Sequence, residues 1–140
     1  MKVVVPLDMS ETANRAISLA SDIARGLGDE LVLVTVNGER LRSDLAPLSA
    51  SEGVPVPEMI EAFLKSTVAE VSDLTASYRV VKGDNAPAAL VDYVDSDEDV
   101  RMIVMATHGR TGIEKWRLGN VTERVVRHAS VPVTVVPKPR

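Results

Sequence analysis

The chain alternates between short runs of β-branched residues and longer segments in which apolar residues recur every three to four positions. Five runs are short and almost continuously apolar, as in strands buried on both faces of a parallel sheet; they cover residues 2–7, 30–36, 77–82, 100–106 and 131–136. Four segments between them carry an apolar stripe with the period of an α-helix; they cover residues 11–27, 57–74, 86–94 and 120–129. The resulting β-α-β-α-β-α-β-α-β order predicts an α/β protein with helices on both faces of a parallel sheet.

Local signals mark the ends of these segments. Ser10 is suited to the N-cap of the first helix, and Gly26 and Gly28 are expected to end it. The connection from Asn37 to Val56 is polar and contains Pro47, Gly53 and Pro55. Because about twenty irregular residues are long for a compact domain, we expect this connection to be a functional flap or a flexible excursion.

Five parallel strands of this kind most often take the order 3-2-1-4-5 or 2-1-3-4-5, and the periodicity favours neither. In both orders, ligands bind beyond the carboxyl ends of strands where the winding reverses direction. In the first order, that point lies between Pro6-Leu7-Asp8 after the first strand and the segment from Ala106 to Gly109 after the fourth.

Composition narrows the classes of function. The 140 residues suit one domain with a real core, which must be aliphatic because aromatic residues make up only 3%. A net charge of −4 and the scarcity of aromatic residues argue against general nucleic-acid binding. The absence of cysteine excludes disulfides and a cysteine nucleophile, and no apolar stretch is long enough to span a bilayer. We expect a cytoplasmic protein without membrane or nucleic-acid partners.

The segment from Ile103 to Thr122 is the best candidate for a binding site. A strand leads into a loop with Gly109, Gly112 and Gly119, and Asn120 then opens a helix, an arrangement in which backbone N–H groups can surround a phosphate. Between Ala106 and His128 there are five Lys or Arg residues and two acids, a local charge of +3. The alternative is an ordinary connection whose glycines serve only turns. The spacing matches neither a P-loop nor a dinucleotide fingerprint.

Two polar side chains near this segment have alternative interpretations. Asp8 follows the first strand, where its carboxylate could accept from an exocyclic amine or a ribose hydroxyl, or could bond the backbone near Ser10 in an Asx-type turn. His108 could donate to a phosphate, act as a base or simply face solvent. Two isolated histidines without an acidic cluster give no signal for a metal site.

Four separated segments resemble the universal stress protein family: Val5–Ser10, Ile103–Gly112, Leu118–Arg127 and Val131–Val136. The resemblance implies a Rossmann-like, adenine nucleotide alpha hydrolase-like three-layer sandwich. It also implies a five-stranded parallel sheet of order 3-2-1-4-5 and a single domain over residues 1–140. A homodimer joined through the C-terminal strand Val131–Val136 is a further implication, and pairing would protect an otherwise exposed apolar edge.

Nucleotide-binding members of this family carry the motif G-x2-G-x9-G-(S/T) after the fourth strand. The same frame here holds Ala106, Gly109, Gly119 and Asn120, so two of the three glycines are present. The methyl group of Ala106 could crowd a ribose. Asn120 keeps a side-chain donor for phosphate in place of the hydroxyl.

The resemblance implies a role for each matching residue. Asp8 and the backbone of Val36 would hold adenine, and Pro6 and Ala106 would line the ribose, with Leu7 in the same turn. The residues expected at the phosphates are Gly109, Gly119, Asn120, Val121 and Thr122, assisted by His108 and Arg110. The ligand would be ATP, ADP or AMP, with Mg²⁺ or Mn²⁺ on the phosphates.

The implied function is that of a stress-response regulator or sensor. No catalytic residue is assigned, because the loop shows no water-activating base with an orienting partner. The alternatives are a nucleotide-independent interaction protein of the same fold and a slow ATP-hydrolysing enzyme.

Overall fold

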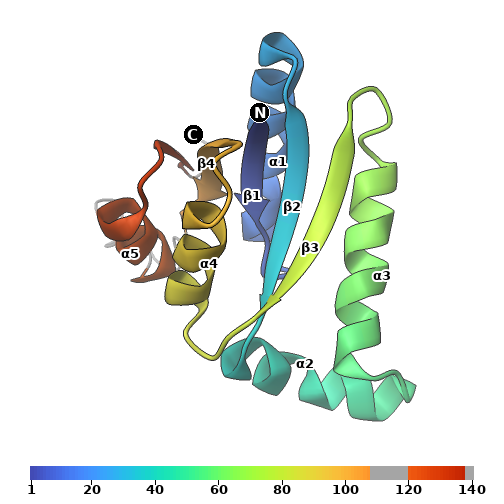
Figure 1. The fold of residues 1–140 in the computed structure, drawn as a ribbon. Coiled ribbons are helices and arrows are strands. Elements are labelled where there is room, and N and C mark those ends of the chain that lie inside the picture. Colours follow the sequence, from blue (N-terminus) through green and yellow to red (C-terminus); the bar gives the residue numbers. More distant parts are fainter. Residues whose placement is uncertain (108–119, 138–140) are drawn as a thin grey trace.

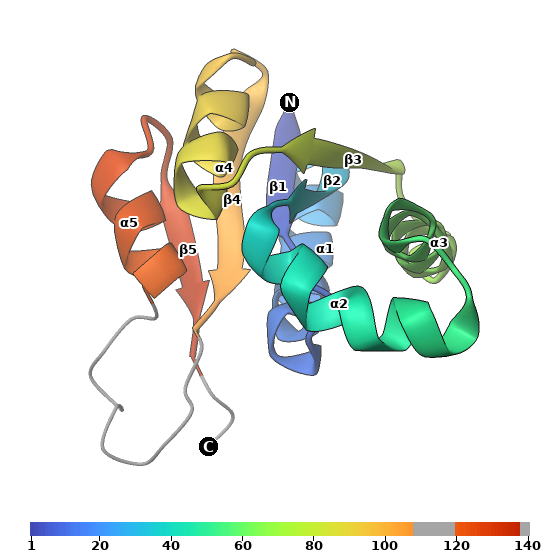
Figure 2. The same cartoon turned by 90° about the horizontal axis from the view of Figure 1, so that it is seen from below.

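Five parallel strands form a single sheet in the computed structural model, which describes residues 1–107 and 120–137. The strand order is β3-β2-β1-β4-β5, so the order predicted from the family resemblance is confirmed (Figure 1 for β1 to β4; Figure 2 for β5). Every neighbouring pair is parallel. The strands are β1 (Lys2–Pro6), β2 (Glu30–Asn37), β3 (Ala76–Lys82), β4 (Val100–Ala106) and β5 (Val133–Val136).

Helices cover both faces of this sheet and make the three-layer sandwich that the sequence predicts (Figure 2). The helices of the described residues are α1 (Glu11–Leu27), α2 (Glu39–Glu52), α3 (Val56–Ala69), α4 (Ala86–Asp95) and α5 (Asn120–His128). Buried residues of α1 and α3 share one apolar cluster with the sheet, and those of α4 and α5 share another on the opposite face.

The strands supply both clusters because successive side chains point to opposite faces. In β1, Val3 and Val5 join the α1–α3 cluster and Val4 joins the α4–α5 cluster, and all three are fully buried. In β2, Leu33 and Val34 divide in the same way. Burial on both faces explains why these strands are almost continuously apolar.

Helix α1 forms as predicted. The Ser10 hydroxyl accepts a hydrogen bond from the Ala13 N–H (3.2 Å), and the helix ends at Gly28, which has a left-handed φ of 69°. Ala16, Ala20 and Ala24 are fully buried, and their small side chains let the helix backbone approach the sheet closely. Gly26 lies inside the helix, so only Gly28 serves as its end.

The expectation of an irregular connection from Asn37 to Val56 is wrong. Residues Glu39–Glu52 form helix α2, which begins after Gly38 and ends at Gly53 with a φ of 67°. None of its residues is buried, and Pro47 lies in its interior. Of its residues only Leu41 and Leu45 pack against the α1–α3 cluster, an apolar stripe too short for the pattern to predict a helix.

Two other boundaries differ from the prediction. Helix α3 ends at Ala69, yet Val71 and Leu74 still pack against the α1–α3 cluster from the connection that follows. These apolar residues extended the periodic pattern past the end of α3, so the predicted helix was too long. Strand β5 begins at Val133 instead of 131, although the Pro132 carbonyl already accepts a hydrogen bond from the Ile103 N–H (2.9 Å).

Candidate functional site

The winding of the sheet reverses between β1 and β4. From β1 the chain proceeds outward through β2 to β3, whereas β4 and β5 extend the sheet on the other side. The carboxyl ends of β2, β1 and β4 are neighbours, so the residues that follow them form a row along one edge of the sheet. A reversal of this kind leaves room for a ligand beyond the strand ends.

The turn after β1 holds Asp8 at this edge. The Asp8 carboxylate accepts hydrogen bonds from the Ser10 N–H (3.0 Å) and the Ser10 hydroxyl, as expected for the Asx-type turn, one of the two alternatives that the sequence left open for Asp8. Met9 between them has a φ of 67°, a left-handed conformation that is uncommon for a residue other than glycine. The turn thus orients Ser10 to cap α1 while Asp8 stays exposed at the end of the strand.

The side chains beside Asp8 point to different faces of the sheet. Val36 and Val121 are half-buried against the α4–α5 cluster. Pro6 is half-buried and, by the alternation of the strand, shares a face with Val4 in that cluster. Leu7 is only 3% exposed and packs in the opposite cluster, so its side chain points away from Pro6.

The end of β4 is held by both helical layers. The Thr122 hydroxyl of α5 donates a hydrogen bond to the Ala106 carbonyl (3.4 Å), and Thr122 is fully buried. The next carbonyl, that of Thr107, accepts a hydrogen bond from Arg15 Nη2 of α1 (3.1 Å). The Thr107 N–H donates to the Val136 carbonyl of β5 (3.1 Å). The chain leaves β4 from a firmly positioned point.

Helix α5 begins at Asn120, beside the end of β4 that Thr122 contacts. The first N–H groups of a helix have no partner within the helix, and its N-terminus carries a partial positive charge. Because the Thr122 hydroxyl is engaged with Ala106, Thr122 would offer an anion its backbone N–H group and not its side chain.

The structure therefore brings together the predicted residues Pro6, Asp8, Val36, Val121 and Thr122 around the ends of three adjacent strands. Ala106 is there too, but its side chain is only 6% exposed and packs in the α1–α3 cluster. The predicted residues His108, Gly109, Arg110 and Gly119, and the side chain of Asn120, lie outside the described residues.

Three residues at this edge escaped the sequence prediction: Met9, Arg15 and Thr107. A left-handed methionine has no signature in the sequence. Arg15 adjoins the buried stripe of α1 near its N-terminus, so helical periodicity could have placed it at the carboxyl edge of the sheet. Its bond to Thr107 joins residues 92 positions apart, which no local pattern predicts.

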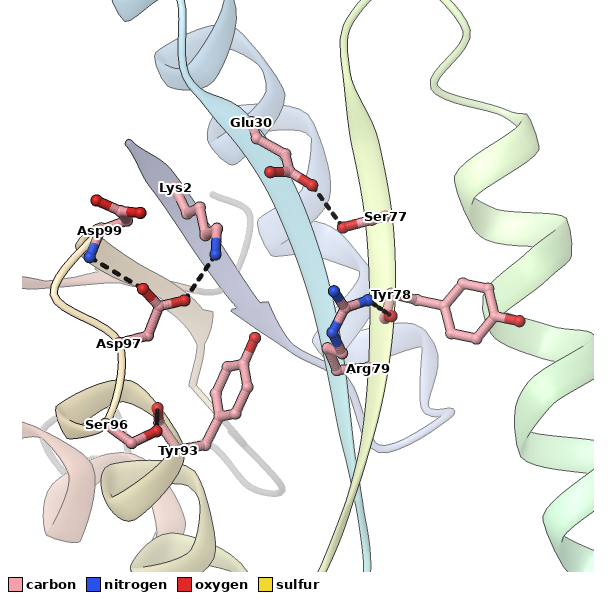
Figure 3. Close-up of polar contacts among 9 residues, drawn as sticks. All are labelled: Lys2, Glu30, Ser77, Tyr78, Arg79, Tyr93, Ser96, Asp97 and Asp99. Atoms are coloured by element: carbon pink, nitrogen blue, oxygen red, sulfur yellow. Dashed lines mark hydrogen bonds and ion pairs between the residues drawn. The ribbon is translucent and has the colours of Figure 1, made fainter.

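A second group of polar side chains lies near the opposite end of the sheet (Figure 3). Lys2 Nζ is 2.7 Å from Asp97 Oδ2, and this hydrogen bond raises the pKa of Lys2 and lowers that of Asp97. The Ser77 hydroxyl donates to Glu30 (2.7 Å), and burial raises the pKa of Tyr93. Lys2 and Asp97 neutralise each other and Glu30 is bonded to Ser77, so we interpret these contacts as structural.

A further hollow, of about 480 Å³, opens between β3 and α4 and is lined in part by Val81, Gly83, Ala89 and Tyr93. It lies at the β3 side of the sheet, separated from the β1–β4 reversal by β2.

In the part of the chain that the structure describes, no three His, Asp or Glu side chains are grouped so that they could hold a metal ion. None of the described helices has the length and apolar character needed to cross a membrane.

The protein thus has an α/β fold, and its candidate ligand site lies at the carboxyl edge of the sheet. There the Asp8 carboxylate follows β1 and the N-terminus of α5 lies beside β4. The chain matches the model of the universal stress protein family over residues 1–137, and it belongs to that family. It is 29% identical to universal stress protein MJ0531 of Methanocaldococcus jannaschii, over 99% of this chain and 83% of the relative.

Solved structures share the fold. The structure of MJ0577, then a hypothetical protein, superposes with a TM-score of 0.76 at 26% identity and covers 99% of this chain and 96% of its own. A universal stress protein in complex with cAMP gives 0.71 at 22% identity, covering 99% and 98%. The universal stress protein from Archaeoglobus fulgidus in complex with dAMP gives 0.67 at 22% identity, covering 96% of both chains.

Proposed function

We propose that this protein binds an adenine nucleotide, ATP, ADP or AMP, at the carboxyl ends of β1 and β4 and acts as a stress-response regulator or sensor. The observation that carries the proposal is the meeting of Asp8, Val36 and the start of α5 at three adjacent strand ends. A carboxylate at one end suits an exocyclic amine or a ribose hydroxyl, and a helix N-terminus at the other suits phosphate. Two proteins of the same fold were solved with cAMP and dAMP.

The burial of Ala106 supports this proposal at the position where the chain departs from the nucleotide-binding motif. Its methyl group packs in the α1–α3 cluster, whereas Pro6 and Val36 lie on the other face of the sheet. An alanine here is accommodated within the protein core. The ribose would rest on Pro6 and on the backbone of β4.

The phosphates would lie at the N-terminus of α5, with Gly109, Gly119, Asn120, Val121 and Thr122 as their expected neighbours. A divalent cation, Mg²⁺ or Mn²⁺, would take its ligands chiefly from phosphate oxygens and water, as Mg²⁺ usually does. The described residues fit that arrangement, because they offer no acidic cluster and the Thr122 hydroxyl is engaged with Ala106.

We also propose a homodimer through β5. The two edges of the sheet differ: β3 carries Arg79 and Lys82, whereas β5 (Val133–Val136) has no charged residue. Charged side chains discourage strand pairing at an edge, and an uncharged apolar edge favours it.

Light scattering after gel filtration tests the homodimer. It should give twice the chain mass of 15.1 kDa, and Val135→Lys should lower the measured mass toward that of the monomer. A monomeric wild-type protein would overturn this proposal.

Calorimetric titration with ATP and AMP tests nucleotide binding. We expect saturable binding with a Kd at or below about 1 mM (roughly −4 kcal/mol). Gly119→Asp would place a negative charge at the expected phosphate position and should weaken binding at least about tenfold, a difference of about 1.4 kcal/mol. The matched control is Gly26→Asp, which adds the same charge on α1 where a new Cβ meets nothing within 4 Å. No heat of binding at millimolar nucleotide would contradict the proposal.

A further inference from the structure

Arg15 is the described basic side chain that reaches the end of β4. It lies in the second turn of α1, and its Nη2 donates a hydrogen bond to the Thr107 carbonyl (3.1 Å). Its Nε donates to the Thr12 carbonyl (3.3 Å), and the side chain is partly buried. The guanidinium is therefore held beside the strand end by two backbone oxygens.

The charge of Arg15 is not neutralised by any carboxylate of the described ranges 1–107 and 120–137. Arg25, in the same helix, pairs with Asp22 (3.0 Å) and Asp73 (2.8 Å). Arg15 makes no such pair, and its two hydrogen bonds go to neutral carbonyls. A guanidinium has five N–H donors, so most of its donor capacity remains.

The position of this charge relative to the proposed site is specific. Ala106 and Thr107 are consecutive, and their carbonyls are held by Thr122 of α5 and by Arg15 of α1. The N-terminus of α5 and the Arg15 guanidinium thus approach the same strand end from opposite layers of the sandwich. A full positive charge and a helix dipole on two sides of one point favour an anion there.

We propose that Arg15 is a specificity-determining residue that favours nucleotides with more phosphate charge, so that the site prefers ATP over AMP. This inference rests on the proposed nucleotide binding. Attraction between a fixed cation and an anion grows with the anion's charge. The contribution of Arg15 should therefore be larger for a triphosphate than for a monophosphate and should weaken with salt.

Two substitutions separate the charge of Arg15 from its hydrogen bond to Thr107. Arg15→Gln keeps an N–H donor and removes the charge, whereas Arg15→Lys keeps the charge on a shorter donor. The matched control is Arg25→Gln, which removes a charge from the same helix at an exposed ion pair. Circular dichroism and thermal melting would confirm that each variant is folded.

The test is the ratio of the dissociation constants for AMP and ATP, measured by calorimetry at two salt concentrations. We expect Arg15→Gln to reduce that ratio by about fivefold to tenfold at low salt, less than the coupling between close charge pairs buried in protein interfaces, because Arg15 is only partly buried. Arg15→Lys should keep it within about threefold, Arg25→Gln should not change it, and salt should reduce the wild-type ratio.

An unchanged ratio in folded Arg15→Gln would overturn the inference, whether both affinities stay the same or fall equally. An equal fall would mean that Arg15 only positions Thr107. If Arg15→Gln does not fold, the wild-type ratio decides, and a ratio independent of salt would overturn the inference. Wild-type protein that binds neither nucleotide would overturn the proposed function and this inference with it.

Discussion

Helices α1 and α2 both follow a strand at the carboxyl edge of the sheet, but they are built differently. Helix α1 has 17 residues, five of them buried, and a side-chain cap from Ser10. Helix α2 has 14 residues, none of them buried, and begins at Gly38 without a side-chain cap. Both end at a left-handed glycine. The same end signal thus stops one helix that belongs to the core and one that lies on the surface.

The two helices are also attached differently. Beyond α1, the Asp29 carboxylate accepts two hydrogen bonds from Arg101 of β4, and its side chain is 3% exposed. Near the start of α2, Arg42 bonds Asp84 (2.9 Å), and both side chains are largely exposed. The first attachment consists of two charge-assisted hydrogen bonds to a carboxylate shielded from solvent, whereas the second is an exposed pair that solvent weakens. We infer that α1 stabilises the fold and fixes the site, while α2 contributes little to global stability.

The largest test of this difference enlarges one alanine in each helix. Ala20 is fully buried against the sheet, so Ala20→Leu should destabilise the protein by about 3 kcal/mol through overpacking. Ala46 of α2 is exposed, and Ala46→Leu should change stability by less than about 0.5 kcal/mol. Urea unfolding followed by circular dichroism measures both. Equal losses would refute the contrast between the helices.

The next test compares the carboxylates of Asp29, which follows α1, and Asp84, which pairs with Arg42 of α2. Asp29→Asn should lower stability by about 2 kcal/mol near neutral pH, because it removes charge-assisted hydrogen bonds to Arg101. Asp84→Asn should have an effect below about 0.5 kcal/mol, because its pair is exposed. The free energy of unfolding at neutral pH distinguishes the two variants.

The Asp29 effect should also depend on pH. The hydrogen bond from Arg101 lowers the pKa of Asp29 in the folded protein below its usual value of 3.8. Ionised Asp29 therefore stabilises the fold above that value, and this stabilisation is lost as the pH falls through the lowered pKa. Wild type and Asp29→Asn should converge in stability as the solution is acidified below that range. A constant difference down to strongly acidic pH would contradict this origin.

A smaller effect is expected at the two left-handed glycines. Gly28→Ala should destabilise by about 1 kcal/mol, because a side chain disfavours a φ of 69°. Gly53→Ala meets the same backbone strain at 67°, but α2 can unfold locally, so global stability should change by only a few tenths of a kcal/mol. Thermal melting compares the two, and a larger loss for Gly53→Ala would show that α2 belongs to the cooperative core.

The same comparison explains how much of the fold the sequence predicts. The strands and α1 are predictable because buried side chains must be apolar and must recur with the period of their element. Helix α2 is not, because only Leu41 and Leu45 pack against the core and the remaining positions are free to be polar. The sheet order could be predicted from the family resemblance, whereas periodicity left two orders open.

The candidate site likewise contains some features that the sequence predicts and others that depend on tertiary packing. Asp8 and the start of α5 are predictable because they follow local signals, a strand end and a helix start. The bond from Arg15 to Thr107 is not, because it depends on how closely α1 packs against β4. The inward direction of the Ala106 side chain likewise follows from the face that β4 presents to α1. Tertiary packing decides both features.

The central claim is that an adenine nucleotide binds at the carboxyl ends of β1 and β4, and amide chemical-shift mapping during an AMP titration tests it most directly. We predict that the largest shifts occur at Leu7, Asp8, Thr107, Val121 and Thr122. Tyr93 and Ala89, in the hollow between β3 and α4, should remain unchanged. Shifts confined to that hollow, or no shifts at millimolar AMP, would contradict the claim.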